Sequence, residues 1–599
     1  MTQIQSLPHW DMSDVYPSLT SPEFAQSFSL LEQRIAELKQ LFEIHHVMEQ
    51  SALAVDETLV ETFEILITSY NALLDHAKEL GTYIVCFVAT NSQDDVAQAK
   101  MSELQQPRVQ IANLAIRLTA WIGSLDVEAL IQRSPLAEAH AHTLRQAKIR
   151  ATHLMSPAEE ELTTELNISG EVAWSKLYST ITSQITVPIE IEGQQQEVPM
   201  SVIRNMASDS NRETRQRAYH AELAAWEKSA VPLAAALNSI KGGVNTLSKR
   251  RHWESGLAVS LFDNSIDRQT LDAMLSAARA AFPDLRRYLH AKARALGLPR
   301  LAWYDLFAPL QTEEKRWNFD EAREFIVTQF GSYSPRLANF AARAFREQWI
   351  DAEPRPGKRD GAFCISVRKD ESRVLSNFRP SFYGVSTLAH ELGHAYHNLN
   401  LAPRTALQKS LPMTLAETAS IFCETIIRNA VLRTANKQEQ ISILEDALQN
   451  FCQLVIDIPS RFLFEQSVFE KRQQRELSVK EFNALMLAAQ RETYGDGLDE
   501  NELHPYMWAV KSHYYSSSSF YNYPYMFGLL FGLGLYAQYQ QDPETFKQGY
   551  DDLLSSTGMA DAATLAARFG IDLHSEGFWR SSLDNIRSNV DRFEALISE

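Results

Sequence analysis

The chain has 599 residues, of which 45% are hydrophobic and 22% are charged, proportions typical of a globular protein. Its formal net charge of −18 and isoelectric point near 5.4 argue against binding to nucleic acid or to an anionic membrane surface. The start, MTQIQSLPHWDMSD, lacks a basic segment followed by an apolar one, so no secretory signal is expected. The four cysteines have no CxxC spacing and favour a reducing cytoplasm over a disulfide framework.

The first 180 residues are predicted to be mostly helical. Apolar residues recur there at spacings of three and four, which predicts long helical segments at residues 24–42 and 59–88 and a third within residues 96–130. At residues 185–202, alternating apolar residues on either side of a Glu-Gly turn predict a β-hairpin. A domain boundary is placed beside it, which gives an N-terminal helical domain of residues 1–195 and a second domain of residues 196–599.

The second domain is also predicted to be largely helical. Its helices are expected at residues 218–247, 267–296, 415–432, 438–470 and 479–493. Residues 301–307 are a candidate strand, and residues 361–367 and 373–378 are predicted to form two more. A Tyr- and Ser-rich stretch at 511–525 interrupts the helices, and the apolar stretch 525–537 is too short to span a bilayer.

The most informative stretch is residues 386–400, STLAHELGHAYHNLN. His390 and His394 are four residues apart and therefore share one face of a helix, where two imidazoles can bind one metal ion. Glu391 lies on the adjacent turn and could accept a proton from an attacking water. The alternative is a chance pair of surface histidines, but only about 0.05 occurrences of this pattern are expected by chance. We therefore predict a metal site, and zinc accepts such nitrogen ligands.

A catalytic zinc site needs a third protein ligand. His397 is seven residues from His390, about 10.5 Å along the helix axis, which is too far to share the ion. It is expected to support a ligand or to pack nearby. Downstream, Glu417 and Glu424 lie two turns apart on one helix face, and spacing alone does not decide which binds the metal. The other would orient a histidine through its second ring nitrogen, unless both are solvated helix carboxylates.

The two strands predicted just before the metal helix suggest a small sheet beside it. An extended peptide can bind to the open edge of such a sheet through main-chain hydrogen bonds. An ordinary structural hairpin is an equal alternative for this pattern.

Beyond these patterns, HELGHAYH followed by LAETASIFCE resembles the M3 family of zinc metallopeptidases, specifically its oligoendopeptidase F branch. Further marks of this resemblance are WDMSDVYP at 10–17, LMSPAEEE at 154–161, GKRDGAF at 357–363 and FYNYPY at 520–525. The resemblance covers nearly the whole chain. It implies a mainly α, two-lobed helical zincin of the gluzincin type, with a small β-sheet beside the metal helix. It also implies a deep substrate channel, with residues 196–599 as the catalytic domain.

The resemblance also implies roles for the residues singled out above. His390, His394 and Glu417 would bind one Zn²⁺ per chain, and Glu391 would be the general base. Glu424 and His397 would then support the ligands.

The family's late histidine corresponds to His513, and its tyrosine corresponds to Tyr521 or Tyr523. These groups would stabilise the oxyanion of the tetrahedral intermediate. The chain departs from the family at residues 516–519, where four serines stand in place of more aromatic residues, so the choice between the two tyrosines is left open.

The predicted function is the hydrolysis of internal bonds of short peptides in the cytoplasm, with neither nucleic acid nor a membrane as partner. A carboxypeptidase would use the same metal site and would also need a cation for the terminal carboxylate of its substrate. The sequence does not single out that cation. A non-enzymatic peptide-binding protein is the third class, but binding alone does not require Glu391. No oligomeric state is predicted.

Overall fold

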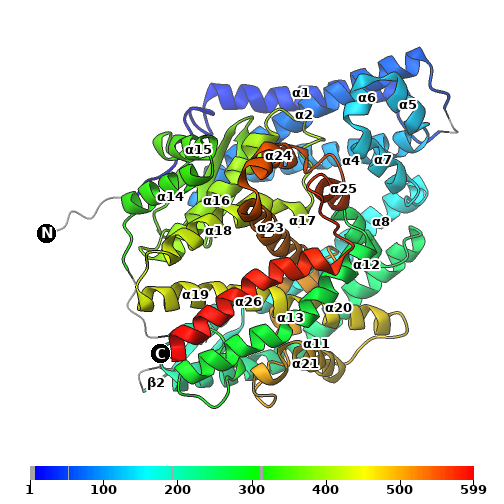
Figure 1. Cartoon of the computed structure of the whole chain (residues 1–599). Helices are drawn as coiled ribbons and strands as arrows, with labels where there is room; N and C mark the ends of the chain where they lie inside the picture. Colours follow the sequence, from blue (N-terminus) through cyan, green and yellow to red (C-terminus); the bar gives the residue numbers. More distant parts are fainter. Residues whose placement is uncertain (1–6, 51–52, 192, 311–314, 599) are drawn as a thin grey trace. The chain divides into compact units, whose positions relative to one another are not determined.

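The computed structural model describes residues 7–50, 53–191, 193–310 and 315–598, and it is mainly helical, as predicted (Figure 1). Contacts divide the chain into two units. Unit 1 comprises Met1–Leu154, Lys315–Thr434 and Gln538–Phe569, and unit 2 comprises Met155–Glu314, Ala435–Ala537 and Gly570–Glu599. Each unit is built from three separate segments of the chain. The domain boundary predicted after residue 195 falls within unit 2, so it does not coincide with this division, and it stays a prediction.

Unit 1 contains the N-terminal helices and the predicted metal helix. Its helices are α1 (Pro22–Ile44), α2 (Glu57–Thr90), α3 (Asp95–Glu103), α4 (Gln105–Gly123), α5 (Val127–Arg133), α6 (Pro135–Ala139), α7 (Ala141–Ala151), α14 (Phe319–Tyr333), α15 (Pro335–Arg346), α16 (Phe382–Leu401), α17 (Met413–Ala416), α18 (Thr418–Leu432), α24 (Pro543–Ser556) and α25 (Ala562–Ala567). The predictions for α1 and α2 are confirmed. The stretch 96–130 is helical as predicted, but it holds most of α3, all of α4 and the start of α5. The chain breaks after α4, and Asp126 caps α5 by accepting a hydrogen bond from the Ala129 amide.

A three-stranded sheet lies in unit 1 and contacts α16. Its strands are β3 (Ile350–Asp351), β4 (Phe363–Arg368) and β5 (Glu371–Leu375), in the order β3-β5-β4. Strand β5 pairs antiparallel with β4 and parallel with β3, so β4 is an edge strand. Asn398 of α16 donates to the Ser372 hydroxyl at 3.1 Å and ties the helix to β5. The predicted sheet beside the metal helix is therefore confirmed.

Unit 2 contains the predicted hairpin and the remaining helices. Its elements are α8 (Pro157–Ser169), α9 (Glu171–Ser183), β1 (Thr186–Ile191), β2 (Gln194–Pro199), α10 (Met200–Asn205), η1 (Met206–Ser208), α11 (Arg212–Arg250), α12 (Gly256–Asp263), α13 (Arg268–Ala295), η2 (Trp303–Asp305), α19 (Lys437–Cys452), η3 (Gln453–Asp457), α20 (Ile458–Arg472), α21 (Val479–Tyr494), η4 (Gly495–Gly497), α22 (Met507–Val510), η5 (Ser512–Tyr515) and α26 (Glu576–Ser598), with most of α23 (Tyr523–Gln541). Strands β1 and β2 pair antiparallel and confirm the hairpin. Glu192, which is part of the predicted turn, lies outside the described residues. Residues 1–6, which belong to the stretch where no secretory signal is expected, also lie outside them.

The strand predicted at residues 301–307 is wrong, because the chain turns there as η2. The buried carboxylate of Asp305 accepts a hydrogen bond from the Ala302 amide at 3.0 Å. Arg212 and Arg215 of α11 both pair with the same carboxylate at 2.9 Å. The local apolar pattern favours a strand, but ion pairs with residues about 90 positions away hold this segment in a turn.

The helix predicted at 438–470 is two α-helices joined by η3, a single turn of π-helix. Pro459, near the start of α20, has no amide hydrogen for the carbonyl of Val455, so regular α-helical bonding is interrupted there. The wider turn includes the buried side chain of Asp457.

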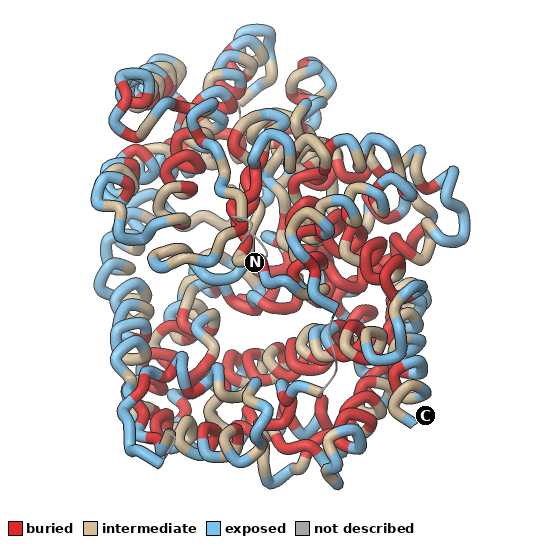
Figure 2. The backbone as a smooth tube through the Cα atoms, turned by 90° about the vertical axis from the view of Figure 1, so that its left-hand side faces the viewer, coloured by how far each residue is buried: buried red, intermediate tan, exposed pale blue. Residues whose placement is uncertain are grey.

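Each unit has its own apolar core. In unit 1 one core cluster extends from Met12 to Leu144, and in unit 2 another extends from Tyr178 to Tyr515. Figure 2 shows how buried and exposed residues alternate along the helices. The apolar stretch 525–537 lies in α23. Within the described part of the chain, no helix is long and apolar enough to cross a membrane.

Helices α16 and α18 lie against each other at Gly393. A Cβ at this position would lie 2.6 Å from the Cα of Ser420 and 2.7 Å from the carbonyl oxygen of Ala419. These are backbone atoms, which cannot move aside as a flexible side chain can. Only glycine therefore permits this contact, and the contact brings the start of α18 against the His390–His394 face.

We predict that Gly393→Ala destabilises the protein by about 1–3 kcal/mol, because the added methyl group forces the two helix backbones apart. The matched control is Gly243→Ala in α11, where an added Cβ meets no atom within 4 Å. That change should stabilise by about 0.5–1 kcal/mol, since alanine favours a helix interior. Denaturant unfolding of both variants measures the difference. An equal or higher stability of the Gly393→Ala variant would contradict the packing described.

Candidate metal centre

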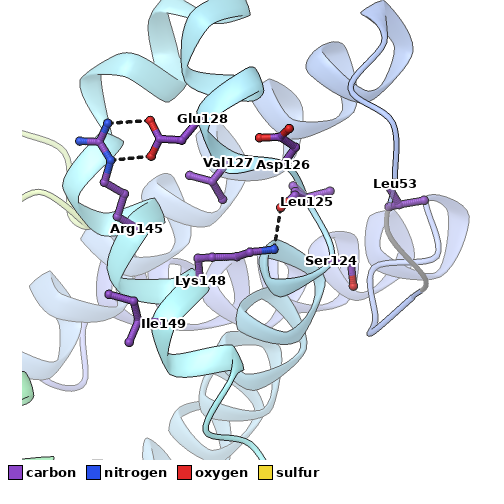
Figure 3. Close-up of a pocket in the computed structure, with 9 residues that line it drawn as sticks. All are labelled: Leu53, Ser124, Leu125, Asp126, Val127, Glu128, Arg145, Lys148 and Ile149. Carbon is purple, nitrogen blue, oxygen red and sulfur yellow. Dashed lines mark hydrogen bonds and ion pairs between the residues drawn. The ribbon is translucent and has the colours of Figure 1, made fainter.

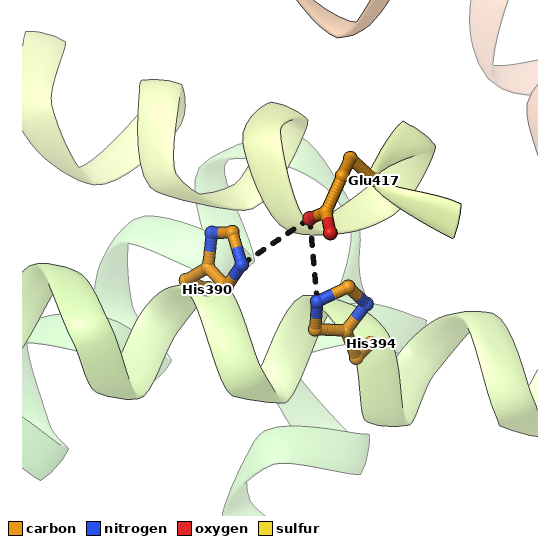
Figure 4. A group of neighbouring side chains, drawn as sticks. All are labelled: His390, His394 and Glu417. Carbon is orange, nitrogen blue, oxygen red and sulfur yellow. Dashed lines mark ion pairs between the residues drawn. The ribbon is translucent and has the colours of Figure 1, made fainter. Parts of the chain in front are cut away.

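Three side chains of unit 1 converge on one point. His390 and His394 are on the same face of α16, and Glu417 stands between α17 and α18 (Figure 4). One oxygen of Glu417, Oε2, is 3.3 Å from Nε2 of His390 and 3.3 Å from Nε2 of His394. All three potential ligand atoms lie within 4.8 Å of one another. Two imidazole nitrogens and one carboxylate oxygen at this separation can hold a metal ion.

The carboxylate of Glu417 is positioned by the first turn of α18. The Ser420 hydroxyl donates to Glu417 Oε2 at 2.6 Å and is 3.2 Å from the Glu417 carbonyl oxygen. Tyr550 of α24 donates to the Thr418 carbonyl at 3.0 Å and anchors the same turn. Sequence analysis did not identify Ser420, although its place three residues after Glu417 is a signal for such a contact.

Glu424 lies on the other side of His390. Its Oε2 is 3.3 Å from Nδ1 of His390, and its Oε1 accepts a hydrogen bond from Arg428 at 3.1 Å. Glu424 therefore orients His390 through the ring nitrogen that does not face Glu417, which is the usual arrangement behind a metal-binding histidine. Arg428 was not identified from the sequence, and its spacing of four from Glu424 was the available signal. The geometry thus separates two carboxylates that spacing alone could not.

The charges at this point favour a cation. Burial lowers the pKa of His390, but Glu417 and Glu424 outweigh burial and raise that pKa well above its usual value. Burial raises the pKa of Glu417, yet contacts with His390 and His394 hold it well below its usual range. Positive charge is stabilised between these groups, and a divalent cation needs the same condition.

Glu391 stands apart from these paired carboxylates. Its side chain is buried, and its Oε2 has no hydrogen-bond partner among the described residues. Burial raises the pKa of this carboxyl above its usual value, and only part of the effect is offset by His390 and His394. A carboxylate in this setting is a stronger base than one in water and retains a free oxygen to accept a proton.

His397 is not one of the converging side chains. Its Nε2 lies 2.9 Å from the Thr557 hydroxyl, at the end of α24, and burial lowers its pKa to about 4. It forms no hydrogen bond to His390, His394 or Glu417 in the described structure. Its visible role is to fix α16 against the segment after α24.

The predicted late residues lie in unit 2. His513 is half-buried, its Nε2 has no partner among the described residues, and its ring stacks on Tyr521 with centroids 6.1 Å apart. Burial, followed by Arg461, Lys511 and Lys241, lowers the pKa of His513 to about 2, so the imidazole is neutral at pH 7.

The two candidate tyrosines differ in environment. Tyr521 is 37% exposed, and its hydroxyl is 2.9 Å from that of Tyr525. Tyr523 is buried, and its hydroxyl donates to the Ser260 carbonyl at 3.1 Å. Of these two hydroxyls, that of Tyr521 is the more accessible to a ligand.

Unit 1 also has an open surface cavity of about 580 Å³ among its N-terminal helices (Figure 3). Its lining includes Arg145 and Glu128, which form a two-point ion pair with each other. Lys148 donates to the carbonyls of Gly123 and Leu125. These charged groups are already paired, and the three converging side chains of the metal centre are not part of its lining.

Comparison with known families matches two regions of the chain. The model of peptidase family M3 matches residues 205–585, and a model described as Oligopeptidase F matches residues 122–186. The three converging side chains lie in the first region. The two regions fall on either side of the sequence boundary predicted after residue 195.

Similar proteins carry oligopeptidase names. The chromosomal oligoendopeptidase F of Lactococcus lactis subsp. cremoris is 24% identical over 66% of each chain. The group B oligopeptidase PepB of Streptococcus agalactiae is 22% identical over 100% of this chain and 98% of its own length. The oligopeptidase PepF of Bacillus subtilis is 20% identical over 100% of this chain and 88% of its own length.

Solved structures share the fold. A putative peptidase from Chlamydophila abortus superposes with a TM-score of 0.81 at 20% identity, covering 98% of both chains. The oligoendopeptidase-F of Enterococcus faecium gives a TM-score of 0.69 at 17% identity, covering 96% of this chain and 99% of that one.

We predict that the purified protein binds about one divalent metal ion per chain and that His390→Ala removes most of it, because two ligands hold an ion far less tightly than three. The control is His290→Ala, which changes a histidine of α13 in unit 2. Metal analysis of the purified proteins measures the result. Full occupancy in the His390→Ala variant would show that the metal is held elsewhere.

Proposed function

The chain belongs to peptidase family M3, and on this premise we propose that it is a zinc-dependent endopeptidase acting on internal bonds of short, unfolded peptides. The observation that carries the proposal is the single oxygen of Glu417 at 3.3 Å from both His390 and His394, beside the buried Glu391. The names of the relatives, oligoendopeptidase and oligopeptidase, support peptides as the substrate class.

The donor set suits zinc. Nε2 of His390, Nε2 of His394 and one carboxylate oxygen of Glu417 are the combination used by zinc peptidases, which leave a further position for water or substrate. Bound there, Zn²⁺ would polarise the scissile carbonyl and lower the pKa of water. Glu424 keeps His390 in the orientation and tautomer needed by holding its Nδ1.

We assign the general base to Glu391. Its partnerless Oε2 and raised pKa suit acceptance of a proton from the attacking water. The protonated carboxyl can then deliver this proton to the nitrogen of the leaving amine as the peptide bond breaks. Because the carboxyl is buried, bulk water does not compete for the proton during the transfer.

We retain His513 and Tyr521 as groups that stabilise the transition state, on the basis of the family resemblance. A neutral imidazole and a partly exposed tyrosine hydroxyl can both donate a hydrogen bond to an oxyanion. We also retain Tyr523 as a candidate. Its hydroxyl, however, already donates to the Ser260 carbonyl and supports the packing of α23 against α12. His397 is assigned a packing role.

The edge strand β4 is our candidate for main-chain contacts with the substrate. It borders the sheet that contacts α16, and an extended peptide can pair with such an edge through backbone hydrogen bonds.

The direct test uses a short peptide that is acetylated at its N-terminus and amidated at its C-terminus. An endopeptidase cuts this peptide at an internal bond, whereas a carboxypeptidase requires a free terminal carboxylate. Mass spectrometry of the products separates the two enzymes. The same sequence placed within a folded protein should survive, and no cleavage of the blocked peptide by the zinc-loaded protein would refute the proposal.

We predict that Glu391→Gln retains zinc and lowers kcat by about 10²–10⁴-fold, because an amide cannot accept the proton. Glu417→Gln should weaken zinc binding itself, since a neutral carboxamide is a poorer ligand than a carboxylate. Zinc content and steady-state kinetics are measured for both variants. If Glu391→Gln lost its zinc while Glu417→Gln kept metal and activity, the two roles would be reversed and Glu424 would be the next ligand to test.

We predict that Tyr521→Phe and His513→Ala lower kcat by roughly 10²–10³-fold without changing zinc content, because the hydrogen bonds they lose are made in the transition state. Tyr523→Phe is the matched comparison. It should lower stability by about 1 kcal/mol through loss of the bond to Ser260 and reduce kcat less than Tyr521→Phe does. A larger loss of kcat in Tyr523→Phe would assign the catalytic hydroxyl to Tyr523.

A further inference from the structure

Unit 2 carries an unbalanced positive charge beside His513. Three cations act electrostatically on this imidazole: Arg461, Lys511 and Lys241. Lys241 is paired with Glu465 at 2.7 Å in the interior of the unit. Arg461 is paired with Asp457, four residues earlier in the same helical stretch. The remaining cation, Lys511, is paired with no carboxylate of the described residues.

The Asp457–Arg461 pair makes further hydrogen bonds in this region. Asp457 is buried in the π-helical turn η3, and the Tyr494 hydroxyl donates to its Oδ1 at 3.3 Å. Arg461 also donates to the side-chain oxygen of Asn522 at 3.0 Å, next to Tyr521. The guanidinium therefore links η3 to the segment that carries the candidate catalytic tyrosine. With Asp457 committed to Arg461, its negative charge is already balanced.

Lys511 stands just before η5, two residues from His513, and is half-buried. In the described part of the chain, its amine forms no hydrogen bond and no ion pair. Burial, followed by the charges of Arg461 and Arg204, lowers its pKa to about 8, and Asp457 and Glu222 offset only part of this effect. It therefore remains mostly protonated at pH 7.

Glu222, the second carboxylate that acts on Lys511, is also paired with other groups. Glu222 lies 3.5 Å from Arg204 and accepts a hydrogen bond from the Trp226 indole at 3.1 Å. Two carboxylates thus balance two arginines, and Lys511 is left as one surplus positive charge. A half-buried ammonium without a counter-ion destabilises a folded protein. A ligand that supplied the counter-ion would remove this cost.

We propose that Lys511 binds a carboxylate of the peptide substrate, so that the protein favours peptides carrying a negative charge at one fixed position. The carboxylate comes from the C-terminus of the peptide or from an acidic side chain. The inference rests on the proposed function, because it takes a peptide as the ligand. A bound carboxylate would provide the counter-charge that the protein lacks at this point, next to the residues that we assign to the transition state.

The charge pattern argues against a purely structural role. A structural lysine that is partly or fully removed from water is normally held by a carboxylate or by backbone carbonyls, as the buried Lys241 and the half-buried Lys148 are in this chain. Lys511 has no such contact with any described residue. The segment that carries it also includes His513, whose buried Nε2 has no hydrogen-bond partner among the described residues, and Tyr521, whose side chain is exposed.

The test uses four versions of one short peptide, with a free or amidated C-terminus combined with Glu or Gln at one internal position. Binding is measured by fluorescence anisotropy with the zinc-loaded full chain carrying Glu391→Gln, which prevents hydrolysis. In this background, one of the two carboxylates should tighten binding relative to its neutral counterpart. Which of the two does so identifies the source of the carboxylate.

Lys511→Met should weaken binding of the preferred acidic peptide by about 10- to 100-fold and should leave the fully neutral peptide within about twofold. Lys511→Arg, which keeps the charge, should retain the preference. The matched control is Lys480→Met, which removes an exposed lysine at the start of α21. Thermal unfolding of each variant verifies folding, and removal of an unpaired cation should not lower the Tm.

Equal binding of the four peptides before any change at Lys511 would overturn the inference, as would an equal loss for acidic and neutral peptides in Lys511→Met. Cleavage of the neutral peptide by the protein with Glu391 intact reports on the proposed function separately. If that peptide is cleaved and no preference depends on Lys511, only the inference is wrong. If none of the four peptides is cleaved, the proposed function fails and the inference fails with it.

Discussion

The contact between α16 and α18 at Gly393 is the constraint on which the metal centre depends. With a hydrogen atom in place of a side chain, the backbone of one helix lies against the backbone of the other. That approach lets one oxygen of Glu417 face the imidazoles of His390 and His394 at equal distances. A bulkier residue at 393 would separate the helices, and the carboxylate could no longer face both rings.

The same electrostatic principle applies at both candidate sites, but it favours ions of opposite charge. In unit 1 the carboxylates of Glu417 and Glu424 surround His390 and favour positive charge between them. In unit 2 the carboxylates near His513 are already paired with arginines or a lysine, and Lys511 is left without a partner. The first arrangement suits a cation and the second suits an anion. Both depend on low local polarity, because a charge that is removed from water needs a partner to be stable.

Glu391 illustrates how burial can prepare a residue for proton transfer. Its neighbours on α16 are the two histidines that face Glu417, yet its own Oε2 has no partner. Burial raises its pKa, so the free carboxylate is a better base than it would be at the surface. Glu417 and Glu424 carry the same functional group, and contacts with imidazole or guanidinium lower their pKa values instead.

Local pattern in the sequence was sufficient for the long helices, the hairpin and the histidine pair, because these depend on spacings of two to four residues along one segment. It failed where distant residues decide the outcome. Residues 301–307 turn because Asp305 is held by Arg212 and Arg215. Glu417 faces both histidines from the start of α18, where α18 lies against α16 at Gly393. Likewise, Tyr521 and Tyr523 are two positions apart, yet their surroundings come from other segments. Residue types and local spacing therefore tell which chemical groups are present and on which elements they lie. Whether these groups meet, are buried or lack a partner depends on the folded chain, because those properties arise from contacts between segments far apart in the sequence.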